Sequence, residues 1–160
     1  HPDFYPTDLL SDILCNGSSS RLYRRLLKQR QLFTQIDCYL TGSVDPGLFI
    51  IEGHPAKGVS QEEAERAIWR ELEEIKSQSV PKRELPKIKN RIESTLVFSE
   101  MNVLNKAINL AFFELLGDAD YINQEVNLYK AVTTADLQRI ANEILTPENC
   151  SELYYQAQAN

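Results

Sequence analysis

Histidines are the scarcest of the residues that could do chemistry in this chain. Only two are present, His1 at the start and His54 further along. The helical zinc motifs HExxH and HxxEH each place two histidines on one face of a helix, and neither motif occurs in the sequence. His54 comes before Pro55, a context that predicts a histidine at the end of a strand rather than a ligand or a general base. We therefore expect no metal site in this chain.

The other common catalytic motifs are missing as well. A serine nucleophile elbow needs GxSxG, whereas Gly17 is followed by three serines and Arg21, with no second glycine. The phosphate-binding loops GxGxxG and GxxxxGK[ST] are absent. Glu62, Glu63 and Glu65 form a cluster of carboxylates, but we expect them on a solvent-facing helix where nothing raises the pKa of one above another. The sequence thus predicts no catalytic residue.

The three cysteines, Cys15, Cys38 and Cys150, are odd in number and widely separated. This pattern fits neither a disulfide framework nor the paired CxxC spacing of a zinc site. We expect three free thiols.

Length and charge set the broad class. The chain has 160 residues, and 23 acidic against 17 basic residues give a net charge of −6. A spread acidic charge lacks the basic patch that nucleic acids and anionic lipids require, so neither is expected as a partner. The longest apolar run, at residues 48–51, is far shorter than the roughly 20 residues of a membrane-spanning helix. We expect a single domain over residues 1–160.

Hydrophobic spacing predicts the elements of the first half. Apolar residues three and four apart indicate a short helix that ends at Asn16-Gly17, and a second helix over residues 21–30 whose basic face we expect to be solvated. From Phe33 to Thr41 the period changes to two, which predicts a half-buried strand. A turn at residues 45–47 then leads into residues 48–51, apolar on both faces as in a more central strand, so the two strands form a hairpin.

The second half reads as mostly helical. Ser60 and Glu63 form a capping box that begins a helix running to about Lys76, with Glu62, Glu65, Glu73 and Glu74 outward. A pattern over residues 85–117 is long enough to predict two packed helices with a break near residues 99–100. Three further elements are expected: a helix over residues 121–130, a helix capped by residues 133–134 and ending before Pro147, and a closing strand at residues 153–155.

The landmarks of the sequence follow a recognisable order. Residues 1–3 (HPD) precede a helix ending in Asn16-Gly17, residues 20–23 (SRLY) open the basic helix, and residues 134–149 form a closing segment that begins TADLQ. This order resembles the insulinase/pitrilysin zinc metallopeptidases. Members of that family share a sequence pattern like "hpD…a…iLg.G.sSRLy..LR". Two strands and long helices follow it, and the chain closes with a pattern like "vT..DLq.iA..yl.pen". The resemblance covers nearly the whole chain.

The resemblance implies an α+β fold of two layers, in which helices cover one face of a mainly antiparallel sheet, as in half-domains of the processing-peptidase type. Family members join two halves around the substrate: the first carries HxxEH with a distal Glu and binds zinc, and the second supplies no zinc ligand. With only His1 and His54, this chain resembles the second, C-terminal type. The family also places one or two strands before the "hpD" helix, so we expect the sheet of this chain to be incomplete at its start.

One departure falls where the second half of the family aids catalysis. Members of the family have an Arg and, seven residues later, a Tyr in the pattern "LR…GlaY", and both side chains point toward the scissile peptide. In this sequence Leu27 stands at the Arg position and Thr34 at the Tyr position, because residues 31–34 (QLFT) replace "GlaY". Leu27 donates no hydrogen bond and Thr34 is short. We therefore expect a degenerate substrate-positioning site at Leu27 and Thr34; in a shifted register, Arg24 or Arg30 would serve instead.

The resemblance implies a non-catalytic domain that completes a substrate chamber and holds peptides against a separate zinc-bearing half, in the same polypeptide or in another subunit. Zinc is expected in that partner half and not in this chain. A structural scaffold or core subunit that has lost peptidase function is the alternative. Self-association into a homo-oligomer is also expected, through an uncovered sheet edge.

Overall fold

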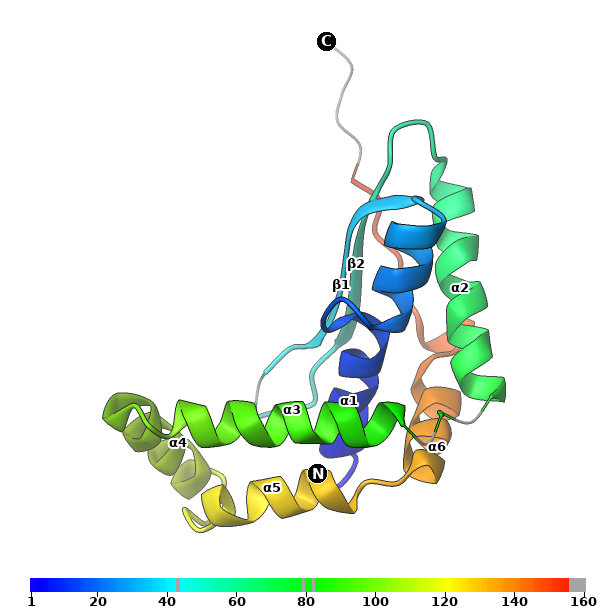
Figure 1. Cartoon of the computed structure of the whole chain (residues 1–160). Helices are drawn as coiled ribbons and strands as arrows, with labels where there is room; N and C mark the ends of the chain where they lie inside the picture. The colour runs from blue at the N-terminus through cyan, green and yellow to red at the C-terminus, as the bar shows by residue number, and fades with distance from the viewer. Residues whose placement is uncertain (43, 79, 82, 156–160) are drawn as a thin grey trace.

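The computed structural model describes residues 1–155 except 43, 79 and 82. Helices cover one face of a hairpin of two strands (Figure 1). In chain order the elements are α1 (Phe4–Cys15), η1 (Tyr23–Gln29, a π-helix), β1 (Phe33–Leu40), β2 (Phe49–Pro55), α2 (Gln61–Ser77), α3 (Glu84–Ser99), α4 (Val103–Leu115), α5 (Tyr121–Ala131), α6 (Thr134–Ile144) and η2 (Pro147–Asn149, a 3₁₀ turn).

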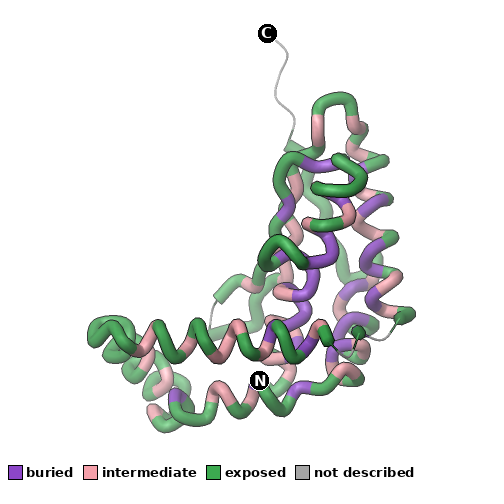
Figure 2. The backbone as a smooth tube through the Cα atoms, in the orientation of Figure 1, coloured by how far each residue is buried: buried purple, intermediate pink, exposed green. Residues whose placement is uncertain are grey.

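Helix α1 lies at the centre of the core. The side chains of Leu9, Leu10, Ile13 and Leu14 are fully buried, because their spacing puts all four on the sides of the helix that face other elements. The helix packs against β1 and α6, and also against α3 and α5. Figure 2 shows this buried zone running along α1 and the facing side of α2. The predicted short helix is thus confirmed, and it anchors every layer of the domain.

The hairpin is antiparallel, with Cys38 opposite Ile51 and Leu40 opposite Phe49. At Gly53, a Cβ atom would lie only 2.7 Å from the ring of Phe33, so a side chain there would push the two strands apart. The pairing is interrupted between Phe33 and Gln35, which leaves Thr34 in a bulge. The predicted hairpin and the α+β, helix-covered architecture are confirmed.

Local capping explains where three helices begin. At the start of α2 the Ser60 hydroxyl accepts from the Glu63 amide at 3.1 Å, which is one of the two bonds of the predicted capping box. Thr133 and Asp136 form a reciprocal capping box at α6. The predicted break after residue 99 lies between α3 and α4, where the Asn102 side chain caps the new helix. These starts follow from the sequence because caps act within a few residues.

Two predictions about packing were wrong. None of the described residues of α4 is buried, and Leu104 and Leu115 are exposed, so the break does not produce two packed helices. Helices α3, α4 and α5 instead form an arm that projects from the body (Figure 1). Strand β2 is not central, because in the described part of the chain its one neighbour is β1. Helix packing and sheet order depend on distant partners, which the local pattern does not contain.

Residues 153–155 also differ from the prediction, since they form no strand and are exposed. The tail is fixed by side chains instead: Trp69 donates to the Glu152 carboxylate at 3.3 Å, and the Tyr154 hydroxyl donates to the Glu65 carboxylate at 2.9 Å. Both partners lie on α2. The segment therefore runs beside a helix, and its backbone is not paired with a strand in the described structure.

Candidate substrate-positioning site

Leu27 and Thr34 flank the turn that connects η1 to β1. Leu27, on the last turn of η1, is half-buried and packs against the core. Thr34 is exposed in the β-bulge, and its hydroxyl donates to the backbone carbonyl of His54 on the neighbouring strand at 3.1 Å. Bulges commonly redirect a side chain next to a functional site. The bulge gives Thr34 an outward position on the hairpin.

The last backbone hydrogen bonds of η1 span more residues than those of an α-helix. The Arg30 amide donates to the Arg25 carbonyl at 2.9 Å, and the Leu32 amide donates to the Leu26 carbonyl at 2.8 Å. Gln31 has φ +52°, and it is the single non-glycine residue with positive φ in the part of the chain that the structure describes. Only one residue in the left-handed region is needed to direct the chain from the helix into the strand.

The basic face predicted for residues 21–30 is only partly solvated, because two of its arginines are used in ion pairs. Arg25 binds the Glu74 carboxylate through both terminal nitrogens, at 2.5 and 2.6 Å, and also donates to the buried Glu71 at 2.5 Å. Hydrogen bonding to Glu74 is the first cause that raises the pKa of Arg25, and the same bond lowers the pKa of Glu74. One turn earlier, the buried Arg21 pairs with Glu84 at 2.9 Å. The sequence expectation was wrong because these arginines meet carboxylates on α2 and α3.

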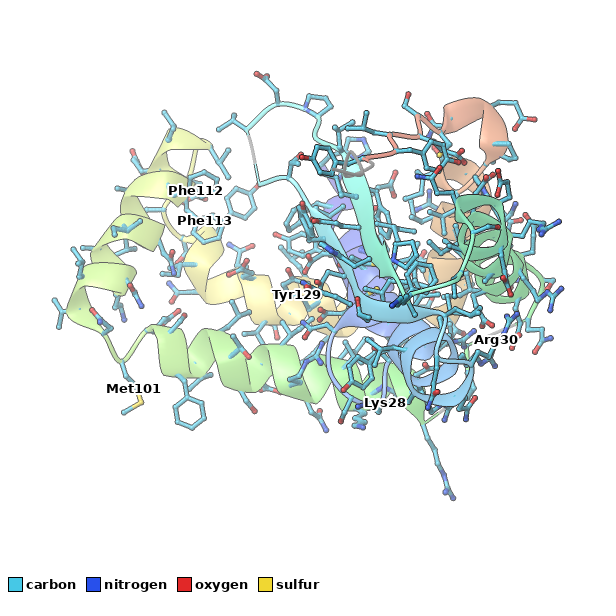
Figure 3. All side chains as sticks on the ribbon, turned by 90° about the horizontal axis from the view of Figure 1, so that it is seen from above. Lys28, Arg30, Met101, Phe112, Phe113 and Tyr129 are labelled. Carbon is cyan, nitrogen blue, oxygen red and sulfur yellow. The ribbon has the colours of Figure 1, made fainter. Side chains whose placement is uncertain are left out.

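These ion pairs hold η1 in place beneath the candidate site. The remaining basic residues of the segment, Arg24, Lys28 and Arg30, are exposed. Figure 3 shows Lys28 and Arg30 at the surface, with Lys28 Nζ 5.4 Å from the centre of the Tyr23 ring. Arg24 and Arg30, the alternative donors of a shifted register, are thus accessible to solvent and are not used in the ion pairs of Arg21 and Arg25.

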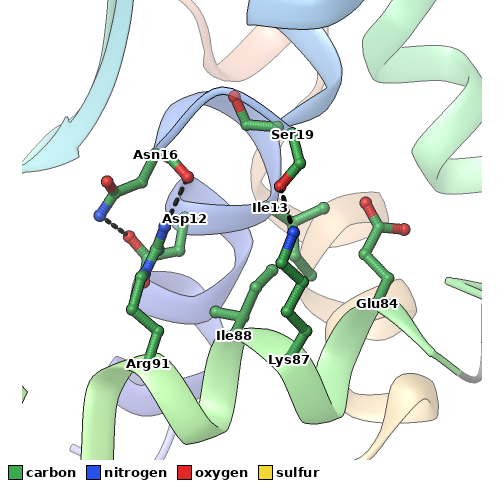
Figure 4. A pocket seen from close by; sticks show the side chains of 9 residues that line it. Asp12, Ile13, Asn16, Ser19, Glu84, Lys87, Ile88 and Arg91 are labelled. Carbon is green, nitrogen blue, oxygen red and sulfur yellow. Dashed lines mark hydrogen bonds and ion pairs between the residues drawn. The ribbon is translucent and has the colours of Figure 1, made fainter. Parts of the chain in front are cut away.

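A second polar cluster joins α1 to α3 on the surface (Figure 4). Arg91 donates to the Asn16 carbonyl at 2.6 Å and lies 2.8 Å from the Asp12 carboxylate, while Lys87 donates to the Ser19 hydroxyl at 2.7 Å. The cavity between them has a volume of only about 60 Å³. Because the basic side chains already have partners, we interpret this cluster as a structural tie between the two helices.

The sequence profile of the family described as "Peptidase M16 inactive domain" matches residues 1–92. This match covers more than half of the chain. The chain belongs to the peptidase M16 inactive-domain family. The matched range contains α1, η1, the hairpin, α2 and the start of α3, and therefore the whole candidate site. No curated protein matches the sequence.

Solved structures share the fold of this inactive domain. The inactive peptidase domain of a candidate zinc protease from Bordetella parapertussis has a TM-score of 0.87 and 23% identity, over 98% of this chain and 85% of that one. A similar candidate zinc protease from Bordetella pertussis Tohama I gives 0.85 and 23%, over 99% and 87%. A protease from Helicobacter pylori gives 0.82 and 24%, over 89% of this chain and 35% of that one. This chain thus spans about a third of the length of the Helicobacter protein.

The zinc that the family implies does not fit this inactive domain. His54 is exposed on the hairpin beside Glu52, and His1 lies beside Asp3 before the first helix. Within the described ranges, no three His, Cys, Asp or Glu side chains are grouped so that they could hold a metal ion.

In the same residues no helix is both long and apolar enough to cross a membrane.

Sequence reasoning missed the ion pairs that anchor the site of this inactive domain. A signal was present: Arg21 and Arg25 are four residues apart, and Glu71 and Glu74 are three apart, so each pair shares one side of its helix. Pairing Arg25 with both glutamates, and Arg21 with Glu84, required knowledge that α2 and α3 lie beside this segment, which comes from the tertiary structure.

Proposed function

We propose that this inactive domain completes the substrate chamber of a zinc metallopeptidase and positions extended peptides against a separate zinc-bearing half. The main support is the match of residues 1–92 to a family of inactive peptidase domains. The relatives from Bordetella, described as candidate zinc proteases, point the same way. The zinc-bearing half belongs either to the same polypeptide or to another subunit, and the peptide is the shared substrate.

The position of Gln31 supports the alignment that places Leu27 and Thr34 in the site. In the family phrase "GlaY", glycine is the first residue, and Gln31 stands at that place in this sequence. Gln31 has φ +52°, in the region that glycine occupies without steric cost. A register shifted by one or more residues would put the family glycine at a residue of ordinary helical or extended backbone. This favours Leu27 and Thr34 over Arg24 and Arg30.

The local chemistry supports a weakened site. An Arg at position 27 and a Tyr at position 34 would each offer donors to a peptide carbonyl or an oxyanion. Leu27 offers none, and the hydroxyl of Thr34 already donates to the His54 carbonyl. The positioning of a peptide would then depend on the backbone of the hairpin and on the shape of the chamber.

A scaffold role is the second candidate function. The loss of both donors is the observation that favours it, since a domain that only holds an assembly together needs neither group. In that case the ion pairs of η1 with α2 and α3 would serve the stability of the domain alone.

Complementation separates the two candidates. The chain is mixed with, or fused to, a half that carries HxxEH, and cleavage of an unstructured peptide is followed with and without a chelator. We expect chelator-sensitive cleavage that requires this chain. Leu27→Arg with Thr34→Tyr should raise kcat/KM, by up to about 10²-fold for each restored donor. Leu48→Arg, on an exposed leucine of the hairpin loop, is the control and should change little. Cleavage that never depends on this chain would favour the scaffold.

A further inference from the structure

Two cysteines lie together where α1 meets β1. Cys15 is the last residue of α1 and is buried, and Cys38 is in the middle of β1 and packs half-buried against the same core. Helix α1 and strand β1 pack directly against each other, and both cysteines line one cavity. Neither of them, nor the exposed Cys150, is in a disulfide. The fold therefore brings together two thiols that are far apart in the sequence.

The pair is reached from the surface. Cys15 and Cys38 both line an open cavity of about 400 Å³, together with residues of the α1 terminus and of both strands. An open cavity of this volume has room for a small thiol reagent or for one end of a small-molecule disulfide. Hidden thiols in a closed core would not be accessible in this way.

We propose that Cys15 and Cys38 form an oxidisable dithiol that closes to a disulfide when it meets a small-molecule disulfide such as oxidised glutathione. This inference does not depend on the proposed peptide-positioning function.

The reaction is a double thiol–disulfide exchange. The Cys38 sulfur, the more exposed of the two, loses its proton and attacks one sulfur of oxidised glutathione, whose S–S bond breaks and releases one glutathione. The Cys15 sulfur then loses its proton and attacks Cys38 in the mixed disulfide, which releases the second glutathione. The two protein thiols are oxidised, one glutathione disulfide is reduced, and both protons end on the released thiols.

The surroundings predict a slow reaction. Burial is the first cause that raises the pKa of Cys38, followed by the neighbouring Cys15 and the charge of Asp37. Since the thiolate is the attacking form and the Cys38 thiol stays protonated at neutral pH, its attack on a disulfide is slow. Whether the pair is oxidised at equilibrium depends on the ratio of reduced to oxidised glutathione and not on this rate.

The disulfide would close a loop around the candidate site. Residues 16–37 lie between the two cysteines and contain η1, the turn at Gln31 and the bulged Thr34. Cross-linking removes conformational freedom mainly from the unfolded chain, and more so for longer loops. Oxidation should therefore stabilise the domain and make the η1–β1 segment more rigid.

The test is to equilibrate the folded chain with reduced and oxidised glutathione in varied ratios, block the remaining thiols and map the peptides by mass. We expect a Cys15–Cys38 cross-link, with Cys150 outside it. The oxidised chain should show a Tm higher by about 5–10 °C and slower amide exchange over residues 16–37. Cys38→Ser should abolish the cross-link and the rise in Tm, whereas the matched control Cys150→Ser should keep both.

Three results would overturn the proposal. The first is that Cys15 and Cys38 stay fully available to the blocking reagent in oxidised glutathione while circular dichroism shows a folded chain. The second is that the disulfide that forms joins Cys150 to either of them. The third is that the Cys15–Cys38 disulfide forms but lowers Tm, since strained geometry would then outweigh loop closure.

Discussion

At the scale of single residues, the proposed site lacks two groups that would position a substrate. In the proposed alignment, Leu27 stands at the position of a cationic donor, and the Thr34 hydroxyl donates to the His54 carbonyl of the hairpin. Gln31 occupies a conformation that glycine adopts more easily. We propose that these residues keep the backbone path of the η1–β1 turn while changing what that turn offers to a ligand.

Gln31→Gly tests the cost of this conformation. Relief of the left-handed strain should outweigh the added freedom of the unfolded chain, so we expect a free energy of unfolding higher by about 0.5–1 kcal/mol. Urea denaturation measures it. Gln29→Gly, inside η1, is the matched control and should lose about 1 kcal/mol. Equal losses for both variants would show that Gln31 carries no strain.

Asp8 gives a prediction about pH. Burial is the main cause that raises its pKa above the ordinary 3.8, although the hydrogen bond from Tyr129, 2.8 Å long, lowers it in part. Because the folded state favours the protonated form, the stability that Asp8 contributes is complete below about pH 3.8 and is lost as pH rises through the higher folded-state pKa. Asp8→Asn keeps an acceptor for Tyr129 without the charge.

We therefore expect Asp8→Asn to gain stability relative to the wild type as pH rises from 3 to 7. The measurement is urea unfolding of both proteins at several pH values. Asp3→Asn, at a more exposed site beside Arg139, is a control that should show no such gain. A difference between Asp8→Asn and wild type that stays constant with pH would contradict the assignment.

At the scale of elements, the decisive feature is the attachment of η1. This π-helix lies at the surface, yet it carries the residues on one side of the candidate site. Arg21 links it to α3, and Arg25 links it to α2. Wide helical turns have less favourable backbone geometry than an α-helix and often occur at functional sites. Its position depends on contacts with two helices that follow the hairpin in the sequence.

Arg25→Ala should reveal this dependence. The substitution leaves Glu71 buried without its cation, so we expect a loss of about 2–3 kcal/mol in the free energy of unfolding, at the lower end for a pair that is partly open to solvent. Arg24→Ala, its exposed neighbour, should change stability by less than about 0.5 kcal/mol. If adding Glu71→Gln to Arg25→Ala recovers none of the loss, the unpaired carboxylate is not its cause.

At the scale of the whole molecule, the domain has a dense body and a thin arm. The body is built on α1, the hairpin, α2 and α6, whereas α4 at the end of the arm has no buried residue among those described. Figure 3 places Phe112 and Phe113 of α4 at the opposite end of the molecule from Lys28 and Arg30, and Figure 1 shows α4 away from the body. Stability should therefore be concentrated in the body.

Two leucines compare the body with the arm. Leu137 on α6 is 1% exposed and Leu104 on α4 is 66% exposed. Leu137→Ala should cost about 2–5 kcal/mol, because it leaves a cavity in the core. Leu104→Ala should cost less than about 0.5 kcal/mol. Thermal or urea unfolding of both variants gives the comparison. A large loss for Leu104→Ala would mean that α4 is buried in solution.

The sequence by itself determined the elements whose causes are local. Each of these was predicted and depends on residues within a few positions of one another: the α1 stripe, the hairpin, the Thr133 cap and the break before Asn102. Contacts between distant segments decided the rest. Each of the following features requires two distant segments to be placed in space. They are the pairing of Arg25 with Glu71 and Glu74, the exposure of α4, the attachment of residues 152–154 to α2, and the position of Cys15 and Cys38 at one cavity. Side-chain spacing shows which face a helix presents, but only packing in three dimensions selects what that face contacts.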